Sequence, residues 1–381
     1  MEQKKIKISG IPAILWGAPA PRIFIHVHGK MSAKEYAADF AEIAAERGFQ
    51  TLSFDLPEHG ERAGEPDRCD IWNGIRDLNI IADWVFSKWN DVSLFACSLG
   101  AYFSLNAYAG RPFKRCLFQS PVVDMAYLVQ QMMTWFDVTE ARLEAEKEIA
   151  TPIDPLRWDY FQYVKAHPIE TWPIPTAILY GGKDALQSRA VLDAFAGRFH
   201  CKLTVSEESD HPFMQPGDDE IVRRWIGANL PPCITTLPLT QARLADCVSL
   251  YIRAFSGAPW YDEFPSEQPV YDYFESFLRL DAFLGYIAVV DGKVAALSVG
   301  MKKPWIGGVE YYIDEFCVDP DLQGMGIGSQ LLADIEKDLS ARGMRGMLLN
   351  TEESYPAYRF YRKNGFEKLG DLCVLGKLLG K

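Results

Sequence analysis

The sequence lacks an excess of positive charge and lacks any long apolar run. Its 381 residues include 39 Lys and Arg against 51 Asp and Glu, which gives a formal net charge of −12. Because no surplus of cations is present to neutralise phosphates, nucleic acid is a poor choice of partner. No segment reaches the roughly 18 consecutive apolar residues of a membrane span, so no membrane partner is expected.

Paired cysteines and an export signal are missing as well. Eight cysteines are scattered along the chain without a C-x-x-C pair. This pattern predicts reduced thiols, with neither a disulfide framework nor a metal site. Residues 1–8 are polar and alternating, without the apolar core of a signal peptide. We therefore expect a cytoplasmic protein.

What the sequence does have is the composition of a globular protein, with 48% hydrophobic and 24% charged residues. At roughly 100–200 residues per domain, the length favours two or three compact units. The best boundary is the double proline Pro231-Pro232, where a helical pattern ends and a new series of segments begins. We predict one domain over residues 1–230 and another over residues 234–381.

In the first domain, short apolar segments alternate with helical patterns, which indicates an α/β fold with a mostly parallel sheet covered on both faces. The first two apolar segments are too close together for a crossover helix and predict an antiparallel hairpin at one edge. The expected strands are 6–9, 11–16, 22–28, 50–56, 91–97, 114–119, 176–180 and 202–206, and the expected helices are 34–47, 72–89, 100–109, 189–199 and 219–230.

One long segment interrupts this alternation. Residues 121–175 have helical but no strand periodicity. So long an insertion after a strand favours a helical cap or lid over the sheet. A helical subdomain without a gating role is the alternative.

A candidate nucleophile lies where a strand turns directly into a helix. Residues 96–100 read Ala-Cys-Ser-Leu-Gly, close to the G-x-S-x-G nucleophile elbow, with alanine in place of the first glycine. A serine hydroxyl needs a neighbouring base, and a tight turn presents it at the carboxyl edge of a sheet. Asp184 follows the expected strand 176–180, and His211 follows the next one, 202–206. The order Ser98, Asp184, His211 predicts a catalytic triad. Asp184 as a plain helix N-cap and His211 as a surface histidine are the alternatives.

On this order of residues, the first domain resembles an α/β-hydrolase. Residues 27–30, Val-His-Gly-Lys, resemble the oxyanion-loop motif of that family. Residues 54–60 resemble its D-x-P-G-H-G turn, with Glu58 in place of a glycine.

The resemblance implies a role for each matching position. Ser98 attacks an acyl carbonyl, and His211 takes and returns the proton. Asp184 fixes the histidine tautomer, and the backbone N–H groups of Lys30 and Leu99 hold the oxyanion.

Other residues near these motifs have competing interpretations. Asp124 is the fallback for the acid, whereas Asp210 is too close in the chain to orient its neighbour's ring. His26 and His28 lie two apart on one strand, as a metal pair would, but we interpret them as buried packing residues. Cys97 is expected to point away from the nucleophile.

In the second domain, an α+β pattern with a mixed sheet is expected. Asp291-Gly292 between two apolar runs predicts a hairpin turn. The expected strands are 234–237, 284–290, 294–302, 309–318, 347–350 and a closing strand, and the expected helices are 242–255, 270–280, 328–342 and 356–364.

A glycine-rich turn in this domain joins a strand to a helix. Residues 323–328 read Gln-Gly-Met-Gly-Ile-Gly, a composition that lets a backbone approach a pyrophosphate at a helix N-terminus. A Rossmann site uses similar physics, but no βαβ unit with an acidic ribose ligand follows here. The turn fits the acetyl-CoA motif Q/R-x-x-G-x-G/A, and residues 356–366 resemble the A-x-x-F-Y-x-k-x-G-F signature. The domain therefore resembles a GNAT N-acetyltransferase.

This second resemblance implies acetyl-CoA as the cofactor. Tyr361 would protonate the departing thiolate, with a plainly packed tyrosine as the alternative. No histidine lies beyond His211, so Asp314 and Glu315 are the candidate bases, acting through water. The aromatic and acidic residues 259–264 suit an amine cation or form a solvated loop. The residues that would contact the cofactor through their backbone are Cys317, Val318, Gln323, Gly324, Met325, Gly326, Ile327 and Gly328.

Together these patterns predict a bifunctional enzyme: a serine acyl hydrolase for an ester, thioester or amide, joined to an acetyl-CoA-dependent amine N-acetyltransferase. Its partners would be a small acyl substrate and an amine acceptor. The first activity could free an amine that the second acetylates, or the two could be independent. The alternative is a non-catalytic hydrolase-like module that presents substrate to the transferase.

Overall fold

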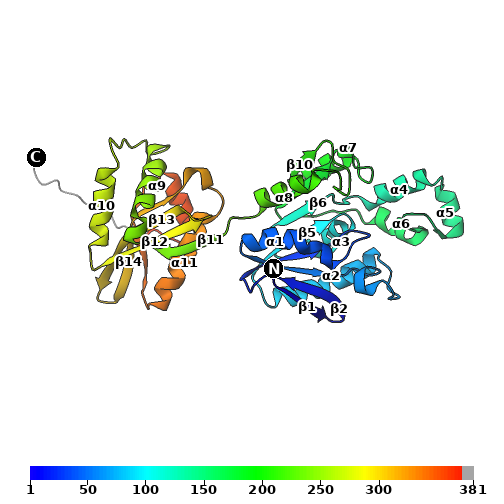
Figure 1. The fold of residues 1–381 in the computed structure, drawn as a ribbon, viewed down its shortest axis with the longest axis horizontal. Coiled ribbons are helices and arrows are strands. Elements are labelled where there is room, and N and C mark those ends of the chain that lie inside the picture. Colours follow the sequence, from blue (N-terminus) through cyan, green and yellow to red (C-terminus); the bar gives the residue numbers. More distant parts are fainter. Residues whose placement is uncertain (371–381) are drawn as a thin grey trace, which may run out of the picture. The chain divides into compact units, whose positions relative to one another are not determined.

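The computed structural model of the protein describes residues 1–370, so the expected closing strand falls outside the described part of the chain. The chain divides into two compact units, Met1–Leu230 and a second that begins at Pro231 (Figure 1). No helix within residues 1–370 combines the length and the apolar character needed to cross a bilayer.

The first unit is built on an eight-stranded sheet in the order β1-β2-β4-β3-β5-β6-β9-β10. The strands from β4 to β10 in this order pair in parallel, whereas β1, β2 and β4 pair antiparallel. The predicted parallel sheet and its edge hairpin are thus confirmed. The strands are β1 (Gln3–Ile8), β2 (Ile11–Trp16), β3 (Arg22–Val27), β4 (Phe49–Phe54), β5 (Asp91–Cys97), β6 (Cys116–Gln119), β9 (Thr176–Gly181) and β10 (Lys202–Ser206).

Helices cover both faces of this sheet. On one face, α2 (Ile71–Phe86), α3 (Leu99–Tyr108) and α7 (Arg189–Phe199) pack into the largest apolar cluster. On the other face, α1 (Ala38–Glu46) and α8 (Asp218–Asn229) enclose a smaller cluster. This two-faced burial explains why the central strands are apolar at successive positions.

The cap is inserted between β6 and β9. It contains α4 (Met125–Trp135), α5 (Glu140–Glu146) and α6 (Trp158–Ala166), as the helical periodicity predicted. The expectation of no strand in this segment was wrong, because β7 (Glu148–Ile149) pairs antiparallel with β8 (Leu156–Arg157). Strands of two residues are too short to produce a detectable alternation.

The second unit contains a five-stranded mixed sheet in the order β11-β12-β13-β14-β15, in which only the β14–β15 pair is parallel. Asp291 (φ 49°) and Gly292 (φ 78°) both adopt positive φ, as the predicted two-residue hairpin turn requires. The strands are β11 (Ile234–Pro238), β12 (Phe283–Val290), β13 (Lys293–Trp305), β14 (Gly308–Val318) and β15 (Gly346–Leu349).

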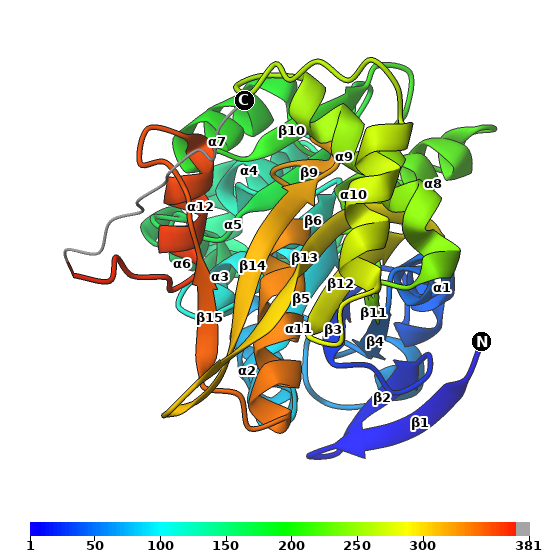
Figure 2. The same cartoon turned by 90° about the vertical axis from the view of Figure 1, so that its left-hand side faces the viewer.

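Four α-helices of the described chain pack on this sheet. On one face lie α9 (Leu244–Ser256) and α10 (Gln268–Leu278), and on the other lie α11 (Ile327–Ala341) and α12 (Pro356–Lys363) (Figure 2). Each pair buries a separate apolar cluster against the strands.

A β-bulge shapes the centre of this sheet. Val299 pairs with Glu315 and Gly300 pairs with Ile313, so Asp314 is an extra residue on β14. β15 pairs only with the first half of β14, from Glu310 to Ile313. The second half of β14 therefore keeps one free edge among the described residues.

Candidate active sites

Ser98 occupies a strained turn between β5 and α3. Its backbone has φ 49° and ψ −119°, a conformation that residues with a side chain rarely adopt. The turn can form without steric overlap because two residues near Ser98 are glycines, which lack a Cβ. A Cβ on Gly100 would overlap the backbone oxygen of His28, and a Cβ on Gly29 would lie 3.0 Å from Ser98 Cβ. Ala96, by contrast, lies fully buried in the core, where its methyl group is accommodated.

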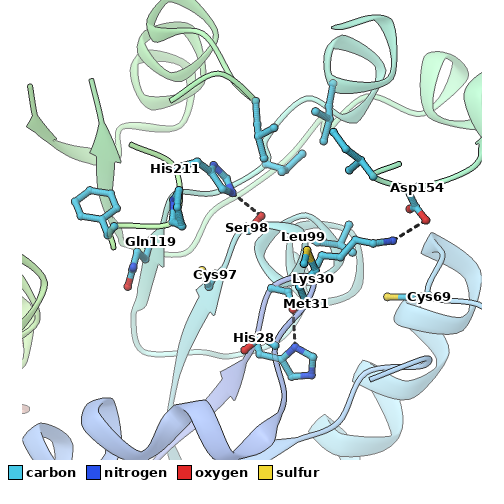
Figure 3. A pocket seen from close by; sticks show the side chains of 18 of the residues that line it. His28, Lys30, Met31, Cys69, Cys97, Ser98, Leu99, Gln119, Asp154 and His211 are labelled. Carbon is cyan, nitrogen blue, oxygen red and sulfur yellow. Dashed lines mark hydrogen bonds and ion pairs between the residues drawn. The ribbon is translucent and has the colours of Figure 1, made fainter. Parts of the chain in front are cut away.

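The predicted triad residues form one hydrogen-bonded chain. Ser98 Oγ lies 2.8 Å from His211 Nε2 (Figure 3), and His211 Nδ1 lies 2.7 Å from Asp184 Oδ2. The Asp184 side chain is inaccessible to solvent, and its other oxygen accepts from the backbone N–H of Leu186 at 2.7 Å. Because an ionised carboxylate only accepts, Nδ1 carries the proton and Nε2 is free to accept from the serine hydroxyl.

The two alternative acids have other partners. Asp124 is the N-cap of α4, and its side chain accepts from the backbone N–H of Tyr127 at 2.9 Å. Asp210 Oδ2 accepts from the side chain of Gln215 at 3.0 Å. Neither carboxylate is bonded to the imidazole of His211.

Lys30 and Leu99, whose N–H groups are the predicted oxyanion donors, lie beside Ser98 (Figure 3). Leu99 is the first residue of α3, so its N–H has no intrahelical acceptor. Lys30 lies in the loop after β3, and its backbone N–H has no hydrogen-bond acceptor within residues 1–370. The Lys30 side chain reaches the cap, where Nζ lies 2.6 Å from Asp154 Oδ1. Two donors are thus available beside the serine for a developing oxyanion.

Two histidines hold this loop in place. His28 Nε2 accepts from the backbone N–H of Leu56, and His59 Nε2 accepts from that of Met31, both at 3.1 Å. Burial lowers the pKa of His28 to about 4, so its ring is neutral near pH 7 and can accept. His26 stacks on Phe95 with ring centroids 4.8 Å apart. No group of three or more metal-ligating side chains converges among the described residues.

Cys97 lies next to the nucleophile in the chain but on the α1/α8 side of the sheet, where it packs against that apolar cluster. Burial, with a smaller effect of Asp184, raises the pKa of its thiol to about 12. The thiol is therefore protonated near neutral pH and a poor nucleophile.

A cavity of about 1310 Å³ opens at Ser98. The cap supplies much of its apolar wall, and the loops that carry the triad supply the rest. Sequence reasoning anticipated the cap but not its individual contacts, since helical periodicity does not say which side chains face a cavity. The cap residues on the wall are Val122, Met125, Leu128, Val129, Met132, Trp135, Glu148, Ile153, Asp154, Pro155, Leu156, Arg157 and Tyr160.

In the second unit, the glycine-rich turn leads from β14 into α11. Gly324 (φ 78°) and Gly326 (φ 86°) adopt conformations that favour glycine, and Gly326 is the N-cap of α11. The N–H groups of Ile327 and Gly328 have no intrahelical acceptors and point out of the helix start. A Cβ on Gly328 would lie 3.1 Å from both Val318 and Phe360. Gln323 donates from its side chain to Val318 O at 3.3 Å, and Met325 is exposed. Open N–H groups and the positive end of a helix dipole are features that suit the binding of an anion.

Tyr361 on α12 lies in an aromatic cluster with Phe316, Phe360 and Phe366. Burial raises its pKa far above the ordinary value, and the neighbouring Cys317 and Glu315 act in the same direction. The hydroxyl is therefore protonated and able to donate. Cys317 is itself buried, and burial raises the pKa of its thiol.

The two candidate bases differ in surroundings. Glu315 is partly buried and its Oε1 accepts from Tyr273 OH at 2.9 Å, whereas Asp314 is exposed on the bulge. Burial raises the pKa of both carboxyls, and for Glu315 the hydrogen bonds from Tyr273 and Tyr251 oppose this shift.

Tyr251 and Tyr273 were not identified from the sequence, because on α9 and α10 they are indistinguishable from other aromatic core residues. Trp260, from the aromatic and acidic segment, packs on Phe255 of α9.

Comparisons with known proteins found separate matches for the two parts of the chain. Residues 245–366 match the Acetyltransferase (GNAT) family. An N-acetyltransferase of Methanocaldococcus jannaschii, described as uncharacterized, is 30% identical over 145 residues. The match covers 37% of this chain and 63% of that relative's length. The C-terminal part thus carries a GNAT domain.

Among solved structures, mouse alpha/beta hydrolase domain-containing protein 10 is 18% identical, covers 60% of this chain and 98% of its own, and has a TM-score of 0.50. At this identity the similarity shows the fold alone, and the fold of the N-terminal part is that of the α/β-hydrolases. An aminoglycoside N-acetyltransferase in complex with CoA is 17% identical over 38% of this chain and 94% of its own, with a TM-score of 0.32.

Proposed function

We propose that residues 1–230 form a serine hydrolase that cleaves an acyl ester, thioester or amide. The observation that carries this proposal is the hydrogen-bonded chain from Asp184 through His211 to Ser98, with the serine in a strained turn at a cavity. Strain of this kind persists only where the surroundings enforce it, and it is common at reacting groups.

In the proposed mechanism, Ser98 Oγ attacks the acyl carbon while its proton passes to His211 Nε2. The N–H groups of Lys30 and Leu99 stabilise the negative charge on the carbonyl oxygen. His211 then protonates the leaving group, and Asp184 stabilises the imidazolium throughout. A water molecule, deprotonated by His211, releases the acyl group and regenerates Ser98.

A fluorophosphonate probe tests this proposal on the full chain. The probe should label the wild type, and Ser98→Ala should abolish labelling because the attacking oxygen is gone. Ser87→Ala is a matched control, since Ser87 is the exposed C-cap of α2 and should leave labelling unchanged. A wild type that resists the probe would favour the alternative, a non-catalytic binding module.

We infer further that the second unit transfers an acetyl group from acetyl-CoA to an amine. The family match over residues 245–366 supports this, as does the open turn from Gln323 to Gly328. The N–H groups of that turn fit a pyrophosphate, and the free edge of β14 at Cys317 and Val318 fits the amide groups of a pantetheine arm. Bound there, acetyl-CoA would supply the activated acetyl group.

The chain's own residues would then handle the protons. Glu315 accepts a proton from the acceptor ammonium, through water, because its carboxylate is held in place by Tyr273 and Tyr251. Tyr361 donates a proton to the departing thiolate. Its raised pKa keeps the hydroxyl protonated, so the proton is available for this step.

Calorimetry with CoA tests the second activity independently. Binding is expected for the wild type and should be lost in Gly326→Val, because a branched side chain at φ 86° distorts the turn. Gly343→Asn is the control, since Gly343 also has positive φ but lies just beyond the opposite end of α11, and asparagine tolerates that conformation. Absence of CoA binding to the wild type would refute the assignment.

A further inference from the structure

The segment that leads into the cap is bonded to two residues of the proposed triad. This cap entry, residues 120–124, joins β6 to α4. The backbone N–H of Val122 donates to Ser98 O at 3.2 Å. The hydroxyl of Ser120, a fully buried residue, donates to His211 O at 2.6 Å. The cap entry therefore holds the backbone of both the nucleophile and the base.

The side chain of Gln187 connects the cap entry to the loop of the third triad residue. Gln187 is fully buried and lies three residues after Asp184, between β9 and α7. Its Oε1 accepts from the backbone N–H groups of Val123 and Asp124 at 3.0 and 2.9 Å. Its Nε2 donates to the backbone oxygens of Asp124 and Leu186, both at 3.0 Å. Both donors and both acceptor positions of the amide are thus used.

The backbone around Gln187 also holds the carboxylate of the acid. Asp184 Oδ1 accepts from the N–H of Leu186 at 2.7 Å and from that of Gln187 at 3.3 Å. On the other side, Gln187 O accepts from the hydroxyl of Tyr180 at 2.9 Å. Because Oδ2 of the same carboxylate faces His211, a shift of this loop would turn the carboxylate away from the imidazole.

A buried amide with all its partners does more than fill space. An apolar side chain of the same length would occupy the same volume, but it would not set the distance between the cap entry and the acid loop. Hydrogen bonds are directional, and a buried network in which every group has a partner is rigid. Gln187 does not line the cavity at Ser98, so its contacts do not serve to bind substrate.

We propose that Gln187 is a positioning residue of the hydrolase, which fastens the acid loop to the cap entry and so keeps Asp184 aligned with His211. The inference rests on the proposed hydrolase function and adds to it a residue that acts only through Asp184. The cap entry continues into α4, whose side chains Met125 and Val129 line the cavity. The triad and this wall of the cavity therefore share one anchor.

Gln187→Met tests the proposal on the full chain with 4-nitrophenyl butyrate as the ester. Methionine has a similar length but makes none of the four hydrogen bonds. A displacement of a catalytic group by about 1 Å can cost about 10²-fold in rate, so we expect kcat to fall by about tenfold to 10²-fold. KM should stay near the wild-type value, because the cavity wall is unchanged. Sites are counted by exhaustive fluorophosphonate labelling, so unfolded protein does not enter kcat.

Gln50→Met is the matched control for the loss of a buried amide. Gln50 on β4 is 4% exposed, and its side chain donates to Gly17 O at 3.3 Å, away from the triad loops. This variant should lose stability but keep kcat per labelled site within about twofold of the wild type. Gln187→Glu is the conservative variant. It keeps an oxygen that can accept from Val123 and Asp124, so its kcat should lie between those of the wild type and Gln187→Met, and it replaces the methionine variant if that one does not fold.

A double-mutant cycle with Asp184→Asn shows whether Gln187 acts through the acid. The rate constant of fluorophosphonate labelling is measured in both backgrounds. If Gln187 only positions Asp184, the methionine substitution should slow labelling in the wild-type background and have less than about a twofold effect in the Asp184→Asn background. A merely structural role would slow labelling equally in both.

The outcomes separate this inference from the function on which it rests. An unchanged kcat per labelled site in Gln187→Met, an equal loss in Gln50→Met, or a loss that persists in the Asp184→Asn background would overturn the positioning role and leave the hydrolase proposal intact. A wild type that neither cleaves the ester nor reacts with the fluorophosphonate probe would overturn the hydrolase proposal itself.

Discussion

Replacing Glu315 with glutamine tests which carboxylate on β14 serves as the base of acetyl transfer. The two candidates are chain neighbours, but the bulge at Asp314 turns them to different surroundings. Glu315 lies against Tyr273 and Tyr251, whereas Asp314 is exposed. A base fixed by hydrogen bonds on one oxygen keeps the other oriented, so we expect Glu315 to be the functional one.

The size of the effect follows from the same contacts. The amide oxygen of glutamine can still accept from Tyr273 OH, so the change from a charged to a neutral acceptor costs about 1 kcal/mol of stability. Loss of a general base lowers kcat by roughly 10²- to 10⁴-fold. We expect Glu315→Gln to fall in that range and Asp314→Asn to remain within about threefold of the wild type.

The assay is the release of free CoA thiol as a function of pH with a saturating amine. Burial raises the pKa of Glu315, so the carboxyl loses its proton, and activity rises, at a higher pH than for an ordinary glutamate. This rise of activity with pH, the acidic limb of the profile, should disappear in Glu315→Gln and persist in Asp314→Asn. If Asp314→Asn loses the limb and Glu315→Gln keeps it, the argument from the tyrosine contacts is refuted.

Three further substitutions probe both sites. Gly100→Ala places a Cβ against the backbone oxygen of His28 and should cost about 1–3 kcal/mol in chemical denaturation; an unchanged midpoint would contradict the turn geometry. Asp184→Asn disfavours the histidine tautomer that accepts from Ser98 and should lower ester turnover by about 10⁴-fold, and a loss below tenfold would point to another acid. Tyr361→Phe removes only a hydroxyl and should lower acetyl transfer by about 10²-fold or more with fluorophosphonate labelling intact; unchanged transfer would leave the tyrosine a packing residue.

The sequence predicted features that depend on local chemistry. The Asp291-Gly292 turn was predicted because only a few residue pairs tolerate two successive positive φ values. The turn at Ser98 was recognisable because strand, small residues and helix follow one another within ten residues. In both cases the determinant and its effect lie in the same short segment.

Features that depend on distant pairing were not predictable. The bulge at Asp314 arises from the register between β13 and β14, and nothing in the surrounding residues distinguishes it from regular strand. The choice between Asp314 and Glu315 therefore stayed open. The cavity at Ser98 is lined by residues as far apart in the chain as His26 of β3 and Val222 of α8. Such a cavity depends on contacts between distant segments, which a periodicity cannot reveal.

The two glycine motifs restrict substitution for different reasons, crowding in the first and backbone conformation in the second. At the elbow the strained residue is Ser98 itself, because the nucleophile needs a side chain, and the glycines relieve crowding around it. Ala96 points into the core and can replace glycine, whereas Gly100 faces the backbone of His28 and cannot. In the second unit, the positive φ values fall on Gly324 and Gly326 directly, where a Cβ would meet no protein atom. The space left there is on the outside of the helix start, which is where a pyrophosphate would bind.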